Sequence, residues 1–451
     1  MIDDQRTAAL REQVAGLMPQ AKTDLAQLVS LRSVADPKQF PQEECERAAQ
    51  WVADAFAAAG LTRVGLHETP DGSKAVIAAR PAPDGAPTVL LYCHYDVQPP
   101  MDEAAWRTPP WELTEKNGRW YGRGSADCKG NIIMHLTALR ALGADLPLGV
   151  TLVAEGSEEQ GTRGLELFVE ANPDLLRADA ILIGDCGNFA VGVPTLTETL
   201  RGGVNVVVTI ETLAGAMHSG MFGGPAPDAL AALIHLLASL RDERGNTTVA
   251  GLPNEQVWPG VQYPSEQFHA DAGVLSGVDL TGDGTVADML WARPALTVLG
   301  IDAPPVVGSS AAIPPIARAR LSLRIPPGTD PGRAHEALIA HLEANTPWHA
   351  KLTVELEGIA APFRSGTGGP ARAAMEAALA ASYGRPATTQ GQGGSIPLCN
   401  VFADTYPGAE IMLLGVEEPA CLIHAPNESV DPKEIERMAL AEALFLATYT
   451  G

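Results

Sequence analysis

Short apolar runs separated by helical segments constrain what the first 200 residues of this chain can fold into. Thr88-Val-Leu-Leu-Tyr, Gly149-Val-Thr-Leu-Val-Ala-Glu and Asp179-Ala-Ile-Leu-Ile-Gly-Asp are β-rich, and the last two are nearly continuous apolar runs. Such runs are typical of strands buried on both faces. Residues 129–142 predict a helix between the first two runs. Strands that alternate with helices indicate an α/β sheet with parallel members.

The polar residues that follow these runs have a predictable location. In open α/β sheets, ligands bind outside the carboxyl ends of the strands. Four side chains of types that can bind metals or protons fall at that edge: His94, Glu158, Glu159 and Asp185.

The pattern changes near Arg201. The sequence predicts strands at 204–211, 317–325 and 351–357, with helices at 228–240 and 331–343. We assign the insert to a strand–helix–strand–strand–helix–strand order, of which these segments supply three of the four strands. This order is typical of one sheet with helices on one face. We therefore expect an α/β catalytic domain with a mixed, mostly parallel sheet flanked by helices, and an inserted α+β domain. The expected boundaries are 1–199 and 361–451 for the first, and 200–360 for the insert.

Further helices are predicted at 5–30, 43–60 and 370–383, and a strand at 410–415.

Length and charge limit the classes of protein. A chain of 451 residues is too long for one ordinary core. Its net charge of −23 argues against nucleic acid and anionic membranes as partners. The polar N-terminus has no signal-peptide core, and the longest apolar stretch, 229–240, is too short to cross a bilayer. The expected location is cytoplasmic.

Residue types that can bind metals recur in similar local settings. At five places such a residue stands at the end of an apolar run or in an adjacent Gly-rich loop. Two histidines and several carboxylates suit a binuclear metal site with a catalytic carboxylate beside it. The leading interpretation is hydrolysis by a metal-activated water. The five stretches are Cys93–Asp96, Ala126–Gly130, Gly156–Glu159, Ile183–Cys186 and Ile423–Glu428.

Taken singly, these motifs allow other interpretations. His94 and Asp96 form an H-x-D pair in which the carboxylate can orient the imidazole, but such pairs also occur on surfaces and in cores. Asp127, between glycines, can be presented by a tight loop and can bridge two metals, or it can simply cap the following helix.

Paired glutamates offer a general base beside a ligand. In Glu158-Glu159 the adjacent side chains diverge, so one can bind metal while the other contacts the water. Glu417-Glu418 also follows a predicted strand and is a competitor, whereas Glu43-Glu44 falls in a predicted helix.

The six cysteines form no CxxC pair, which argues against a structural zinc knuckle. Cys93, Cys128 and Cys186 stand beside candidate ligands and are either thiolate ligands or small buried residues. Adjacent strand residues point to opposite faces, so if His94 faces a metal, Cys93 faces the core.

Four motifs together resemble those of the carnosinase and cytosolic nonspecific dipeptidase group. That group is related to aminoacylases, acetylornithine deacetylases and succinyl-diaminopimelate desuccinylases. The resemblance covers essentially the whole chain. The motifs are His94-Tyr-Asp-Val-Gln-Pro99, Gly122-Arg-Gly-Ser-Ala-Asp-Cys-Lys-Gly130, Glu155-Gly-Ser-Glu-Glu159 and His424-Ala-Pro-Asn-Glu428.

The resemblance implies roles for the candidate residues. One metal would bind His94, Asp127 and Asp185, and the other Asp127, Glu159 and His424. Glu158 would be the general base and Asp96 would steady His94. Relatives often carry a cis peptide after the bridging aspartate, here Asp127–Cys128, although many have an acidic residue where this chain has Cys128.

The insert would then be a lid and dimerisation domain. By resemblance, His218 would stabilise the developing oxyanion, acting in relatives from the partner subunit. Arg324 would bind the C-terminal carboxylate of a dipeptide, and Gly394 and Ser395 would lie in the substrate loop. Without the resemblance, His218 is an ordinary loop residue and Arg324 a solvated strand residue.

The expected protein is therefore a homodimeric dipeptidase acting on small peptides, with two divalent ions, Zn²⁺ or Mn²⁺. One alternative is an N-acyl-amino-acid deacylase or desuccinylase with the same metal chemistry. Another is an inactive binding protein on the same fold. Whether N-acetyl-amino acids are hydrolysed as fast as dipeptides distinguishes the first alternative, and metal analysis with one hydrolysis assay tests the second.

Overall fold

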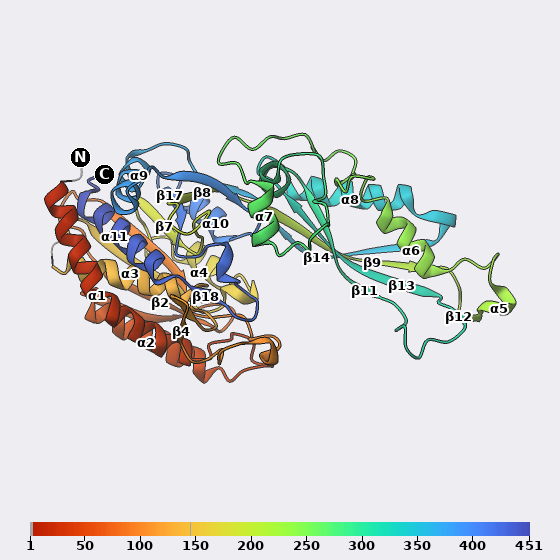
Figure 1. Cartoon of the computed structure of the whole chain (residues 1–451), viewed down its shortest axis with the longest axis horizontal. Helices are drawn as coiled ribbons and strands as arrows, with labels where there is room; N and C mark the ends of the chain where they lie inside the picture. Colours follow the sequence, from red (N-terminus) through yellow and green to blue (C-terminus); the bar gives the residue numbers. More distant parts are fainter. Residues whose placement is uncertain (1–2, 145) are drawn as a thin grey trace. The chain divides into compact units, whose positions relative to one another are not determined.

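The computed structural model describes residues 3–144 and 146–451, which divide into two compact units (Figure 1). The first unit comprises the chain up to Glu198 together with Ser365–Gln390 and Leu398–Gly451. The second comprises Thr199–Arg364 and the short segment Gly391–Pro397. Each unit is described by itself.

A large mixed sheet forms the centre of the first unit. Seven of its strands lie in the order β1-β2-β6-β3-β7-β17-β8. The four central strands β6, β3, β7 and β17 are parallel, whereas the outer pairs are antiparallel. The predicted α/β class is confirmed, and the parallel part is the sheet centre. The strands are β1 (Arg63–Glu68), β2 (Lys74–Arg80), β3 (Thr88–His94), β6 (Gly149–Glu155), β7 (Ala180–Gly184), β8 (Thr195–Leu200) and β17 (Glu410–Leu414).

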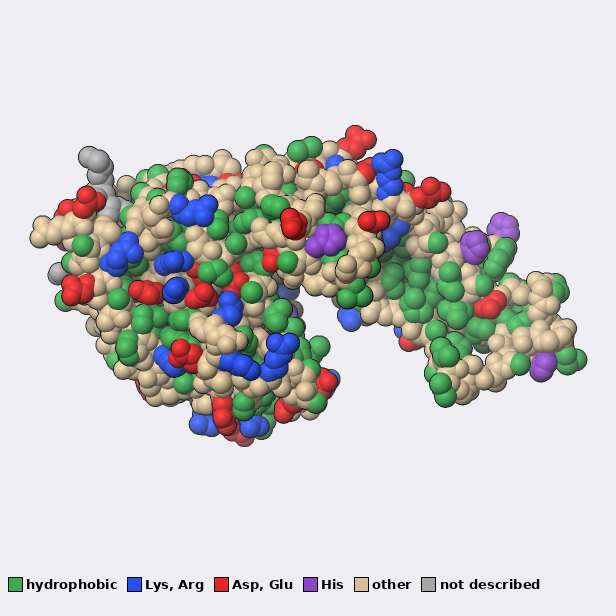
Figure 2. Space-filling view, in the orientation of Figure 1, with side chains coloured by type: hydrophobic (Ala, Val, Ile, Leu, Met, Phe, Trp, Pro, Cys, Tyr) green, Lys and Arg blue, Asp and Glu red, His purple; other side chains and the backbone are tan. Residues whose placement is uncertain are grey.

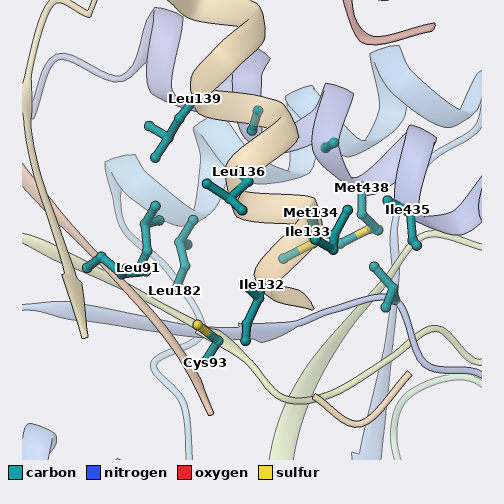
Figure 3. Close-up of a cluster of buried hydrophobic side chains, with 14 of the residues drawn as sticks. Leu91, Cys93, Ile132, Ile133, Met134, Leu136, Leu139, Leu182, Ile435 and Met438 are labelled. Carbon is teal, nitrogen blue, oxygen red and sulfur yellow. The ribbon is translucent and has the colours of Figure 1, made fainter. Parts of the chain in front are cut away.

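Helices cover this sheet because their apolar faces need burial. In Figure 3, Leu91 and Cys93 of β3 and Leu182 of β7 lie beneath side chains of α3, and Met438 of α11 joins the same cluster. Cys93 is fully buried in this core, on the face of β3 away from His94. The helices are α1 (Asp4–Ser30), α2 (Glu43–Ala58), α3 (Lys129–Leu142), α4 (Gly164–Ala171), α9 (Pro370–Tyr383), α10 (Leu398–Thr405) and α11 (Pro432–Thr448).

The second unit contains a four-stranded antiparallel sheet in the order β11-β13-β9-β14. Alternate residues of β9, from Val204 to Ile210, are buried against α6 and α8. The two helices therefore cover one face. The elements are β9 (Gly202–Glu211), α6 (Ala229–Ala238), β11 (Ala295–Asp302), β13 (Ile316–Ile325), α8 (Pro331–Asn345) and β14 (Lys351–Ala360).

Short elements complete the chain. They are β4 (Thr114–Lys116), β5 (Arg119–Tyr121), β10 (Met217–His218), α5 (Ser219–Phe222), α7 (Ser265–Asp271), β12 (Ala312–Ile313), β15 (Phe363–Arg364), β16 (Thr388–Gln392) and β18 (Ser429–Val430). Within the described ranges, no helix combines the length and apolar character needed to span a bilayer.

Candidate metal centre

The carboxyl ends of the four parallel strands carry the candidate site. His94 ends β3, Glu158 and Glu159 follow β6, Asp185 follows β7 and Glu417 follows β17. Because these strands are neighbours, residues far apart in sequence meet at one edge of the sheet.

Asp127 lies between two histidines. Its Oδ1 is 3.0 Å from His94 Nε2, and its Oδ2 is 2.9 Å from His424 Nε2. His94 Nε2 is also 3.1 Å from Asp185 Oδ1, and His424 Nε2 is 3.2 Å from Glu159 Oε2. Each oxygen of Asp127 thus belongs to a different imidazole–carboxylate group. This is the arrangement expected of a bridging carboxylate.

The loop that presents Asp127 is held by a buried glutamate. Glu428 accepts the backbone N–H groups of Gly124 at 2.9 Å, Ala126 at 3.0 Å and Asp127 at 3.1 Å. It also pairs with Arg123 Nη1 at 2.6 Å. The Asp127–Cys128 peptide is cis. Sequence reasoning included Glu428 in a motif but gave it no role, and its place in that motif was the available signal.

Asp96 contacts both the histidine and the glutamate pair. His94 Nδ1 is 3.0 Å from the Asp96 backbone oxygen and 3.4 Å from its carboxylate. The carboxylate oxygens accept the backbone N–H groups of Glu158 at 3.2 Å and Glu159 at 3.0 Å. Asp96 therefore connects the end of β3 to the turn after β6.

The side chains of the competing pair Glu417-Glu418 diverge, as the sequence suggested for Glu158-Glu159. Glu417 offers an oxygen within 4.8 Å of ligand atoms of Asp127 and Asp185, and it accepts Asn131 Nδ2 at 2.7 Å. Glu418 points elsewhere and pairs with Arg119 at 2.5 Å. Sequence reasoning set this pair aside, yet Glu417 borders the site.

Cys128 also borders the site. Its sulfur lies within 4.8 Å of ligand atoms of His94 and Asp185. The thiol donates to the Gly184 carbonyl at 2.9 Å, and burial raises its pKa. A neutral thiol with this hydrogen bond is a poor metal ligand, because metals bind the thiolate.

The electrostatics of the cluster show an excess of buried negative charge. Burial raises the pKa of Glu158 well above its usual value, with Asp185 adding to the rise, and burial raises the pKa of Asp185 to about 6. Burial alone lowers the pKa of His424, but hydrogen bonds to Asp127 and Glu159 outweigh it and raise the value to about 11. The described side chains around the cluster thus supply too little positive charge to balance its buried carboxylates.

The donor set fits divalent cations. Imidazole and carboxylate ligands suit zinc and manganese. Glu159 Oε1 is buried and has no hydrogen-bond partner among the described residues. A buried carboxylate oxygen without a partner is costly, and a cation at this position would satisfy it.

The remaining predicted residues belong to the second unit. His218 is exposed at the start of α5, where its Nδ1 accepts the Gly220 N–H at 3.1 Å. Arg324 donates to Ser395 Oγ at 3.2 Å, and Gly394 precedes Ser395 in Gly391–Pro397. Ser395 in turn donates to the Arg201 carbonyl at 2.5 Å.

Sequence reasoning missed Arg201 as a candidate site residue. Arg201 is only 8% exposed, and its Nε and Nη1 have no hydrogen-bond partner in the part of the chain that the structure describes. Burial, with the Arg324 charge adding, lowers its pKa to about 10. Its place at the start of the predicted insert was the only signal, and it did not distinguish a site residue from a linker.

Comparison with known proteins identifies the family. The sequence profile of peptidase family M20/M25/M40 matches residues 90–448. The chain belongs to this family. It is 44% identical over 443 residues to cysteinylglycine-S-conjugate dipeptidase of Corynebacterium striatum, covering 96% of this chain and 97% of that protein. It is 29% identical over 408 residues to the Beta-Ala-His dipeptidase of Rattus norvegicus, covering 85% of this chain and 82% of that protein.

A solved structure agrees with the fold. The crystal structure of human carnosine dipeptidase 1 superposes with a TM-score of 0.84 at 24% identity, covering 98% of each chain. The resemblance inferred from the four motifs is confirmed by these matches.

Proposed function

We propose that this M20-family protein is a dipeptidase that uses two divalent cations, Zn²⁺ or Mn²⁺. The observation that supports this most directly is the division of the Asp127 oxygens between His94 and His424. One cation would be held by His94, Asp127 and Asp185. The other would be held by Asp127, Glu159 and His424. The relatives named above support dipeptides as the substrate class.

Glu158 is the proposed general base. When bound, paired divalent cations acidify water and polarise the scissile carbonyl. Glu158 accepts a proton from the attacking water as the water oxygen forms a bond to the carbonyl carbon of the substrate. The same carboxyl then gives the proton to the leaving amine as the C–N bond breaks. The burial that raises its pKa suits a group that must hold this proton.

The second unit supplies the proposed substrate contacts. Arg324, with Ser395 and Gly394, would bind the C-terminal carboxylate, because a guanidinium pairs with both oxygens of a carboxylate. Arg201 supports this assignment, since two nitrogens of its guanidinium have no hydrogen-bond partner among the described residues and could receive a carboxylate. His218 would stabilise the oxyanion.

A homodimer is proposed through the second unit. Its edge strand β11 exposes Val298, Leu299 and Ile301, and Figure 2 shows hydrophobic side chains gathered over this unit. Clustered exposed apolar residues mark interaction surfaces. Light scattering after size exclusion is expected to give twice the mass of one chain.

One assay tests the proposed activity. A panel of Gly-Gly, β-Ala-His and an S-substituted Cys-Gly, with matching N-acetyl-amino acids, is assayed before and after chelation and after adding Zn²⁺, Mn²⁺ or Co²⁺. Metal-dependent cleavage of the dipeptides in preference to the N-acetyl compounds is expected. Equal or faster cleavage of the N-acetyl compounds would favour the deacylase.

A further inference from the structure

A surface hairpin outside the metal centre forms hydrogen bonds to the segment that carries Glu158 and Glu159. The turn between β1 and β2 contains Thr69-Pro70-Asp71-Gly72-Ser73. The segment after β6 runs from Gly156 to Gly164 and includes the short helix Glu158–Gln160. Both belong to the first unit.

Asp71 is the centre of the contact. Its Oδ1 accepts Thr69 Oγ1 at 2.6 Å and the Ser73 N–H at 3.0 Å, within the hairpin. Its Oδ2 accepts hydroxyl hydrogen bonds from Ser157, at 2.7 Å, and from Thr162. Ser157 and Thr162 lie on either side of the two glutamates. One carboxylate therefore closes the turn that contains them.

Close packing reinforces these hydrogen bonds at both ends of the segment. A Cβ on Gly164 would lie 2.4 Å from the Asp71 carboxyl carbon, so only glycine allows this approach. At the other end, a Cβ on Gly156 would lie 2.1 Å from Tyr95 Oη, which donates to the Lys74 carbonyl at 2.6 Å. The hairpin therefore packs on the segment through Asp71 at Gly164, and through Tyr95 and the Lys74 carbonyl at Gly156.

Asp96 holds the same turn independently, since its carboxylate accepts the backbone N–H groups of Glu158 and Glu159. Two carboxylates thus restrain the Glu158–Glu159 turn. Asp96 accepts hydrogen bonds from the backbone of the turn, and Asp71 accepts them from the hydroxyl groups on either side of it. Misplacing a catalytic group by about 1 Å can reduce turnover by roughly 100-fold.

We propose that Asp71 is a positioning residue that holds the Glu158–Glu159 turn in its working geometry. The inference rests on the proposed function, in which Glu158 is the base and Glu159 a ligand. Asp71 touches neither substrate nor metal and acts only through Ser157 and Thr162.

The chain offers a matched control. Pro83-Asp84-Gly85 repeats the Pro70-Asp71-Gly72 sequence in another exposed turn of the same unit. For the described residues, no hydrogen bond involves the Asp84 side chain. Asp71→Ala and Asp84→Ala therefore remove the same group from similar turns, and only the first removes contacts to the glutamate segment.

The test measures kcat, KM, bound metal and melting temperature for both variants. Asp71→Ala is expected to lower kcat by about 10–100-fold, with KM and metal content little changed, whereas Asp84→Ala behaves as the wild type. The double variant Ser157→Ala/Thr162→Val keeps Asp71 and is expected to lower kcat similarly, with no further loss on adding Asp71→Ala. An unchanged kcat, or a loss in proportion to lost metal or folded protein, would overturn the proposal.

Hydrogen exchange separates this inference from the proposed function. In Asp71→Ala, amides of residues 156–164 are expected to exchange faster than in the wild type and in Asp84→Ala. This readout needs no substrate. Unchanged exchange would refute the role of Asp71, whereas absence of any dipeptidase activity in the wild type would refute the proposed function alone.

Discussion

Glu428 accepts the backbone N–H of Asp127 at 3.1 Å, so the proposed bridging ligand is positioned through its main chain as well as its side chain. Because Glu428 is fully buried and paired with Arg123, removing it leaves a buried cation without its carboxylate partner. We expect Glu428→Ala to lower the free energy of unfolding by about 3–5 kcal/mol. Urea denaturation measures this.

The milder variant Glu428→Gln keeps an acceptor for the loop amides and serves as the control. It should be less destabilised than Glu428→Ala. Equal stability of Glu428→Ala and the wild type would show that the loop does not depend on this carboxylate.

Metal stoichiometry tests the bridge. His94→Ala and His424→Ala each remove a ligand from one group, whereas Asp127→Ala removes a ligand from both. We expect each histidine variant to weaken one metal site and Asp127→Ala to weaken both. Mass spectrometry of dialysed protein gives the metal content, and retention of both metals by Asp127→Ala would contradict the bridge.

The arginine pair should determine affinity for the substrate carboxylate. Arg324→Ala and Arg201→Ala are expected to raise KM for dipeptides by about 10-fold or more, since each removes a charge-assisted contact worth roughly 1.5–3 kcal/mol. Dipeptide amides, which lack the carboxylate, should be affected much less.

Arg320 is the matched control, because it lies on the same strand and pairs with Glu357 at the surface. Arg320→Ala should leave KM unchanged. If Arg201→Ala affects dipeptides and their amides equally, Arg201 does not recognise the carboxylate.

Low pH should weaken the hydrogen bonds that the Asp71 carboxylate accepts. Burial raises the pKa of Asp71, but hydrogen bonds from Thr162, Thr69 and Ser157 outweigh it, and the net shift is downward. A carboxyl with a lowered folded-state pKa contributes stability above its unfolded pKa, about 4, and loses it as the pH falls. We expect Asp71→Asn to reduce stability at pH 7, and we expect its difference from the wild type to shrink progressively as the pH falls below about 4, as measured by thermal unfolding.

Sequence patterns predicted the elements whose signals are local. The helix predicted at 129–142 is α3, and the strand ends at His94 and before Asp185 are where the alternation of runs and helices placed them. The edge strand β11 was not predicted, because seven of its eight residues are not buried and show no clean alternation. The largely buried helix α11 was also missed, since it shows little amphipathic pattern.

Contacts across long sequence distances lay beyond such patterns. The resemblance proposed the pairing of Asp127 with His424, and the place of Glu417 after a predicted strand made it a competitor for the site. Nothing local, however, indicated that Asp71 binds Ser157. Gly391–Pro397 packs with the second unit, although its neighbours in sequence belong to the first. These features arise from chain folding, which brings distant segments together.

The adjacent glutamates give the most direct test of the central claim, that Glu158 is the base and Glu159 a ligand. Metal content and kcat are measured together for Glu158→Gln and Glu159→Gln. Glu158→Gln should retain both metals and lose about 100- to 10,000-fold in kcat, the usual contribution of a general base. Glu159→Gln should lose metal as well as activity. A Glu158→Gln variant that keeps its metals and turns over dipeptides at nearly the wild-type rate would contradict the account.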